Sequence, residues 1–178
     1  PDRTGNWRLE LAADVAPAVP HTLGPDNRLF STHVPAKIEP GETYTFIVFP
    51  DTQLFAQREP HIFTRMTDWV TANADELNIA AVLHMGDITN NNARTEWENA
   101  FSSMSLLHGV VPYVLTLGNH DMTNGGGGQV KERGLSRIND YFKVEEAQRY
   151  SNLAGTLAPG RLENHYHLFE FGDDKYVV

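Results

Sequence analysis

Three apolar runs, separated by two segments with helical periodicity, constrain the fold of this chain more than any other feature. The runs span residues 44–49, 79–84 and 110–117. From Pro60 onward, and again over residues 94–107, apolar side chains recur at steps of three and four residues. Continuous apolar runs are typical of strands that are buried on both faces of a parallel sheet. This order predicts an α/β domain with β-α-β-α-β connectivity and right-handed crossovers.

Polar side chains follow each of the three runs. Asp51 comes after a proline at the end of the first run, whereas Asp87 and Asn119 each come after a glycine. In an open α/β sheet, the ligand crevice lies outside the carboxyl ends of the strands. We therefore expect three oxygen-bearing side chains, each from a different strand, to meet at one edge of the sheet.

The polar residues belong to three short motifs at positions 51–53, 86–90 and 118–121. Together the motifs supply carboxylate, amide and imidazole groups. Hard and borderline divalent cations prefer such oxygen and nitrogen ligands and need no thiolate. Gly86 and Gly118 would let the backbone turn sharply away from its strand and approach the ions closely. The sequence therefore predicts a site for divalent metal ions.

The motifs resemble the first three of the calcineurin-like metallophosphoesterase family, D-x-H, GD-x-x-[DN] and GNH-[DE], each of which follows a strand. Here they read DTQ, GDITN and GNHD, with Asp87 36 residues after Asp51 and Asn119 32 residues after Asp87. The resemblance covers about residues 43–178. It implies one half of a four-layer α/β sandwich and an activity of metal-dependent phosphoester hydrolysis.

The resemblance also implies a role for each matching residue. Asp51 and Gln53 would bind a first metal ion, and Asn119 would bind a second. Asp87 would bridge the two ions. The cofactors would be two divalent ions, from among Mn, Fe, Zn, Co and Mg, with a bridging hydroxide that attacks phosphorus. His120 would be the general acid that protonates the leaving oxygen, because imidazole exchanges protons near neutral pH.

Three further residues near the motifs carry expectations. Asn90 stands where many relatives have an aspartate that orients the catalytic histidine, and its amide could still hydrogen-bond His120 but would add no charge. Asp121 is expected to support the ligands without binding metal itself. His84 lies within an apolar run, and we expect a packed histidine that makes one hydrogen bond.

The sequence departs from the family pattern in two respects. Gln53 replaces the usual histidine of the first motif, and we expect weaker binding of the first metal or a shifted metal preference. The family completes its site with a later histidine and a G-H-x-H block, which have no match here. We therefore expect residues 1–178 to build only part of the dinuclear site. His165 and His167 fall in an alternating run and are expected to be ordinary strand positions in a hairpin.

Two other functions remain as alternatives at this point. The first is a catalytically inactive binding or structural module on the same fold, which Gln53, Asn90 and the missing histidines favour. The second is a metal-dependent nuclease. The net charge of −9 disfavours the nuclease, because an acidic surface repels nucleic-acid phosphates.

The chain has a proline-rich beginning, with six of its ten prolines in the first 40 residues. Residues 1–42 are expected to form an N-terminal extension or the end of an upstream domain, with short strands at 8–11 and 30–34. Residues 43–178 would be the metallophosphoesterase domain. Because the sequence stops within an apolar run, we expect a domain truncated at its C-terminal side, with that remainder as a possible partner.

Composition excludes several other classes of protein. Hydrophobic residues make up 40% of the chain, which excludes a mainly disordered protein. The absence of cysteine excludes disulfides and zinc–thiolate sites. No apolar run reaches the roughly 18 residues that a membrane span needs, and no targeting segment is visible, so we expect a soluble chain of unknown compartment. The expected substrate is a small-molecule or protein phosphoester, and neither nucleic acid nor a membrane is an expected partner.

The glycine run at residues 125–128 and two tryptophans also carry expectations. The glycine run lacks the lysine of a P-loop, so we expect a flexible loop beside the site. Trp69 and Trp97 lie at helical spacing with other apolar residues, and we expect both to pack in the core.

Overall fold

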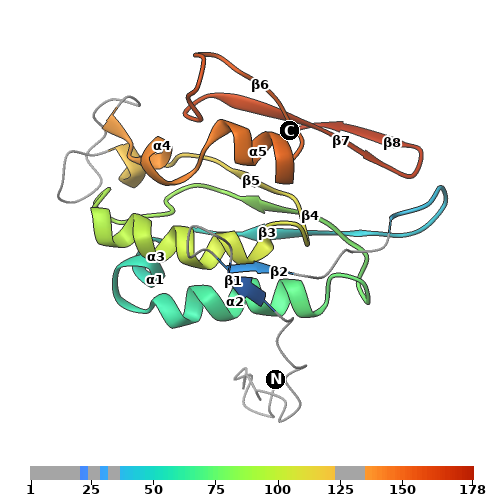
Figure 1. The fold of residues 1–178 in the computed structure, drawn as a ribbon, viewed down its shortest axis with the longest axis horizontal. Coiled ribbons are helices and arrows are strands. Elements are labelled where there is room, and N and C mark those ends of the chain that lie inside the picture. The colour runs from blue at the N-terminus through green and yellow to red at the C-terminus, as the bar shows by residue number, and fades with distance from the viewer. Residues whose placement is uncertain (1–20, 24–28, 32–36, 123–134) are drawn as a thin grey trace, which may run out of the picture.

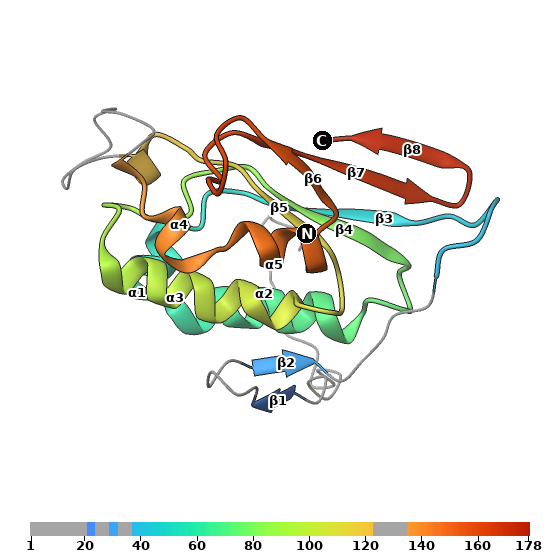
Figure 2. The ribbon, with the colours of Figure 1, turned by 45° about the horizontal axis from the view of Figure 1, so that its top comes forward.

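From residue 43 onward, the described part of the chain forms three layers. The structure is a computed structural model that describes residues 21–23, 29–31, 37–122 and 135–178. The middle layer is a parallel sheet of β3 (Thr45–Phe49), β4 (Ile79–His84) and β5 (Tyr113–Leu115). Helices α1 (Gln53–Arg58), α2 (Pro60–Ala72) and α3 (Arg94–Met104) lie on one face, and a second sheet lies on the other (Figures 1 and 2). The α/β fold is confirmed.

The three parallel strands end at the same level, which positions the motifs. The sheet order is β3-β4-β5, and Phe49 is opposite His84, which in turn is opposite Leu115. The motif residues follow these strand ends directly. The predicted β-α-β-α-β connectivity is therefore present, and it brings the three motifs to one edge of the sheet.

The helices pack on the parallel sheet through a large apolar core. Helix α2 begins with Pro60, a residue that fits the first helical turn because its missing N–H has no partner there. Its fully buried Phe63 packs in this core. Helix α3 contributes Trp97 to the same core, as predicted, and is followed by the short 3₁₀ helix η1 (Ser105–Leu107).

The second sheet contains β6 (Leu153–Thr156), β7 (His165–Phe171) and β8 (Asp174–Val177), paired antiparallel in that order. The hairpin of β7 and β8 confirms the prediction from the alternating run, and it places His165 and His167 on a strand. Buried Phe169 and Phe171 pack against the parallel sheet, with Phe46 beside them. Helices α4 (Ile138–Tyr141) and α5 (Val144–Tyr150), which precede this sheet, were not predicted.

Two expectations of burial were wrong. Val48 of β3 is 55% exposed, so this strand is not buried on both faces along its whole length. Trp69 of α2 is 49% exposed, because it lies on the face of the helix that points away from the sheet. The period of the apolar residues located the helix, but Trp69 lies beyond the edge of its buried stripe.

Short strands were expected in the N-terminal part of the chain, and a loop was expected at the glycine run. The N-terminal part contains β1 (His21–Leu23) and β2 (Leu29–Ser31), which pair antiparallel. β2 overlaps the strand expected at 30–34, whereas the strand expected at 8–11 and the glycine run at 125–128 lie outside the described residues. Within the described ranges, none of the helices has the length and apolar character needed to span a bilayer.

The packing predicts that two aromatic residues on α2 contribute very differently to stability. Phe63→Ala removes a fully buried ring and should lower the free energy of unfolding by about 3–5 kcal/mol. Trp69→Ala, on the exposed side of the same helix, should cost about 1 kcal/mol or less. Urea denaturation measures both. Equal losses from the two substitutions would contradict this assignment of the core.

Candidate metal centre

The first loop, residues 50–53, joins β3 to α1. Asp51 is exposed, whereas Thr52 is fully buried and its carbonyl accepts the first helical hydrogen bond, from Ala56 N–H, at 2.8 Å. Gln53 is the first residue of α1, a helix that the sequence did not predict. The side-chain Oε1 of Gln53 is buried and has no hydrogen-bond partner. Buried acceptors rarely stay unpaired, so this oxygen is suited to a cation.

The second loop, residues 86–92, turns sharply away from β4. Gly86 has a φ of 100° and Asp87 a φ of 47°, both in the left-handed region. A side chain at Gly118 of the third loop would overlap Oδ1 and the amide nitrogen of Asp87. The two loops therefore pack backbone against backbone, as expected from the two glycines.

The third loop, residues 118–122, contains the 3₁₀ helix η2 (His120–Met122). The amide N–H of His120 donates to Oδ1 of Asp87 at 2.9 Å. On the imidazole, Nδ1 lies 2.7 Å from the main-chain oxygen of Asn90. Because a carbonyl oxygen only accepts, Nδ1 carries a proton and donates it. This bond fixes the ring and leaves Nε2 as the nitrogen that is open to chemistry.

Asn90 reaches His120 through its main chain. Its main-chain oxygen, not its amide, orients His120. The side-chain Nδ2 instead donates to Oε1 of Gln57 on α1, at 3.1 Å. A carbonyl oxygen is available at every residue, which explains why an aspartate is not required here for the hydrogen bond.

Asp121 joins the second and third loops. Its buried carboxylate accepts hydrogen bonds from the amides of Ile88 (3.0 Å), Thr89 (2.7 Å) and Gly118 (3.0 Å), and from the Thr89 hydroxyl (2.9 Å). Burial raises the pKa of Asp121 to about 6, although these hydrogen bonds favour the charged form. The residue supports the loops, as expected from its position after the histidine.

His84, at the end of β4, is buried and makes two hydrogen bonds where one was expected. Its Nδ1 accepts from the amide of Gly86 at 3.2 Å, and its Nε2 lies 2.9 Å from the hydroxyl of Thr52. Burial lowers the pKa of His84 to about 3, so the ring is neutral at physiological pH. The role of Thr52 could not be predicted, because a threonine between two polar residues is common in loops.

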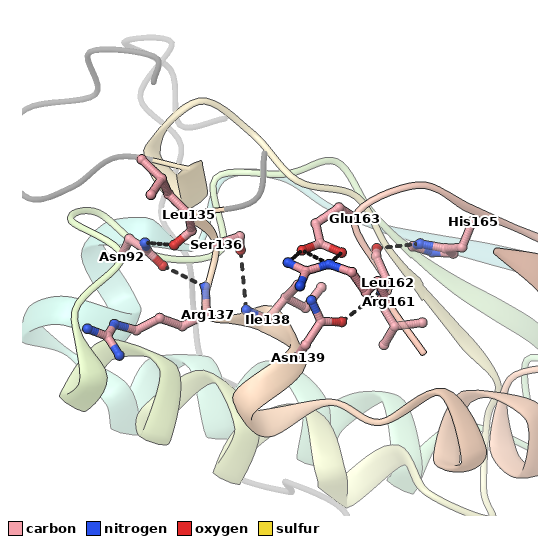
Figure 3. Close-up of polar contacts among 10 residues, drawn as sticks. All are labelled: Asn92, Leu135, Ser136, Arg137, Ile138, Asn139, Arg161, Leu162, Glu163 and His165. Carbon is pink, nitrogen blue, oxygen red and sulfur yellow. Dashed lines mark hydrogen bonds and ion pairs between the residues drawn. The ribbon is translucent and has the colours of Figure 1, made fainter. Parts of the chain in front are cut away.

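The second loop is also connected to the segment that precedes β7, as Figure 3 shows. Asn92 accepts from the amide of Arg137 at 3.0 Å and donates to the carbonyl oxygen of Leu135 at 2.7 Å. Further along, Asn139 accepts from the amide of Leu162 at 2.8 Å. Amide side chains therefore fix both ends of the segment 135–162.

The histidines of β7 take part in strand and loop contacts. Nδ1 of His165 donates to the carbonyl oxygen of Leu162 at 2.7 Å (Figure 3). Burial lowers the pKa of both His165 and His167. Among the described residues, no group of three or more His, Asp or Glu side chains is placed to hold a metal ion.

The structure brings two of the predicted site residues into direct contact. Asp87 is hydrogen-bonded to His120, and both lie at the carboxyl edge of the sheet. The carboxyl end of β3 is followed by Asp51 and Gln53, and that of β5 by Asn119. Their roles as metal ligands stay predictions. The donor set of carboxylate and amide oxygens nevertheless fits a hard divalent cation.

Comparison with known proteins agrees with this arrangement. The model of the calcineurin-like phosphoesterase family matches residues 44–178, which contain all three motifs. The chain belongs to the calcineurin-like phosphoesterase family. Its members generally hydrolyse phosphoesters and typically use divalent metals. The resemblance inferred from the motifs is thereby confirmed.

A relative in this family is the uncharacterized protein YvnB of Bacillus subtilis (strain 168). The two sequences are 33% identical over 139 residues, which cover 77% of this chain and 10% of that protein. The chain thus spans about a tenth of the length of this relative. No solved structure matches the chain.

The carboxylate of Asp121 should contribute strongly to the stability of this calcineurin-like phosphoesterase domain. Asp121→Ala leaves three buried amide donors without an acceptor and should lower the free energy of unfolding by on the order of 3 kcal/mol. Asp140→Ala is the matched control, because the Asp140 side chain is 63% exposed. It should stay within about 0.5 kcal/mol. Similar losses in urea denaturation for both variants would show that the Asp121 bonds contribute little.

Stability should also depend on pH through His84. The unfolded histidine gains a proton below its ordinary pKa of 6.5, whereas the folded one does so only near 3. Lowering the pH from 6.5 toward 4 should therefore reduce the free energy of unfolding, by about 1.4 kcal/mol per pH unit from this residue. Urea denaturation of the wild type and of His84→Asn at several pH values measures the difference. Parallel pH profiles would contradict a neutral buried His84.

Proposed function

We propose that this chain contributes the first half of the active site of a metal-dependent phosphoester hydrolase. The contact between Asp87 and His120 carries the proposal. The main-chain amide of His120 donates to Oδ1 of Asp87 at 2.9 Å, which supports a site in which the residue proposed as general acid lies beside the carboxylate proposed to bridge the ions. Membership of the phosphoesterase family supports the same reaction class.

Four residues of the chain would hold two divalent ions. Asp51 and Gln53 would bind the first ion, Asn119 the second, and Asp87 both. The unpaired buried Oε1 of Gln53 supports this assignment, because a ligand oxygen needs a free lone pair. When bound, two such ions would provide a hydroxide for attack at neutral pH and neutralise charge on the phosphate.

His120 would supply the proton for the leaving oxygen. Its Nδ1–H is engaged by the carbonyl oxygen of Asn90, so the proton to be transferred is on Nε2. The bond also prevents the ring from flipping, which keeps Nε2 directed to one position.

The charge of the protein favours certain substrates. A net charge of −9 makes nucleic acid an unfavourable substrate, so we propose a small-molecule or protein phosphoester. Bound cations would reverse the sign of the potential locally and let a phosphate group approach.

The test of this function measures Mn²⁺ binding and hydrolysis of an aryl phosphate by a longer protein that contains residues 1–178 and supplies the remaining ligands of the site. His120→Ala should lower kcat by about 10²–10⁴-fold while Mn²⁺ affinity is retained. Asp87→Asn should reduce both hydrolysis and Mn²⁺ affinity, because it removes the proposed bridging charge. His61→Ala changes a histidine whose side chain is 67% exposed and should leave both unchanged.

Two results would contradict the proposal. Hydrolysis that is insensitive to His120→Ala would exclude this residue as the general acid. Mn²⁺ binding without any hydrolysis, in the wild type as in the variants, would favour the alternative of an inactive binding module on the same fold.

A further inference from the structure

Thr52 lies between two proposed ligands and is tied to a different loop. It is fully buried, although its neighbour Asp51 is exposed. Its Oγ1 lies 2.9 Å from Nε2 of His84 and 3.2 Å from the carbonyl oxygen of Ile88. His84 precedes the second loop and Ile88 lies within it, so both partners of the hydroxyl flank Asp87.

The direction of these hydrogen bonds follows from the donors. The amide of Gly86 donates to Nδ1 of His84, so Nδ1 has a free lone pair. A neutral imidazole then carries its proton on Nε2 and donates it to the hydroxyl of Thr52. The hydroxyl proton is donated in turn to Ile88, whose carbonyl oxygen can only accept. Each donor in this network therefore has one acceptor. Burial favours the neutral form of His84 that the network requires.

The network holds parts of two loops in a fixed relation. At one end, Gly86 sets the turn that leads into Asp87. At the other, Thr52 starts helix α1 and so fixes the position of Gln53. Both groups are buried, so water does not compete for these bonds.

We propose that His84 and Thr52 are positioning residues, whose hydrogen bonds set Asp51 and Gln53 at the correct distance from Asp87. The inference rests on the proposed function, in which these three residues hold the metal ions. Neither positioning residue touches the substrate. Residues that orient ligands in this way affect metal affinity although they bind no metal themselves.

The test compares three threonine substitutions by Mn²⁺ titration of the chain. Thr52→Val keeps the shape of the side chain but removes the hydroxyl, and it should lower Mn²⁺ affinity by about 10–100-fold. Thr52→Ser keeps the hydroxyl and should restore most of the affinity. Thr67→Val is the matched control: Thr67 is equally buried, but its hydroxyl donates to the carbonyl oxygen of Thr64 within α2. It should leave the affinity unchanged.

A metal-free measurement separates this inference from the proposed function. In NMR spectra of the apo chain, Thr52→Val should shift the side-chain amide resonances of Gln53 and the backbone amide of Asp87, whereas Thr67→Val should not. The imidazole ¹⁵N shifts should also show the Nε2–H tautomer of His84.

The outcomes then distinguish the two proposals. If the unaltered chain bound no Mn²⁺, the metal centre of the proposed function would fail, and the apo spectra alone would decide the inference. Unchanged resonances of Gln53 and Asp87 in Thr52→Val would overturn it. Equal losses of Mn²⁺ affinity in Thr52→Val and Thr67→Val would overturn it as well, because a general loss of stability would then explain both.

Discussion

The close packing of Asp87 against Gly118 is the constraint on which the rest of the site depends. Only a residue without a side chain at position 118 lets the second and third loops approach this closely. The approach brings the amide of His120 to the carboxylate of Asp87 and the amides of the second loop to Asp121. The absence of a side chain at Gly118 thus allows two carboxylates to connect the second and third loops. The carboxylate of Asp87 faces the site, and that of Asp121 is buried. Parallel strands that end at one level make this meeting of loops possible.

Much of this fold could be predicted because apolar residues that are buried in helices and strands recur in the sequence at characteristic spacings. The parallel strands, α2, α3 and the β7–β8 hairpin all follow from the spacing of apolar residues. Helix α1 could not be found in this way, since it is a single short element whose start is set by Thr52 and the network around it. Exposure of Trp69 was also missed, because spacing identifies a helix more reliably than the edges of its buried face.

In the candidate site, too, the sequence pattern predicts which residues lie together, whereas their hydrogen bonds become visible only in the structure. Residue types and their order predicted Asp51, Asp87, Asn119 and His120 as a group at the edge of the sheet. The hydrogen bonds of Asn90 and His84 were not predictable, because they depend on main-chain groups that every residue has. A sequence pattern reports side chains, whereas most of the hydrogen bonds that orient this site involve a main-chain group.

The proposed ligands also reconcile an acidic protein with an anionic substrate. Two of them, Asp51 and Asp87, are carboxylates, and the other two, Gln53 and Asn119, are neutral amides. Two divalent cations would therefore not be fully neutralised by these four side chains, and the site would keep a positive potential within a negative surface. Replacing the family's histidine by Gln53 leaves this balance of charge unchanged, because neutral imidazole and amide ligands carry none.

The hydrogen bonds of Asn92 and Asp121 have a consequence for how this domain can vary. Asp121 accepts from the amides of Ile88 and Thr89, and Asn92 donates to the carbonyl oxygen of Leu135, so both sets of bonds attach to the second loop. The second loop therefore holds the third loop on one side and the start of the segment 135–162 on the other. A substitution that moved the second loop would displace both neighbours at once, so these three segments are constrained to change together.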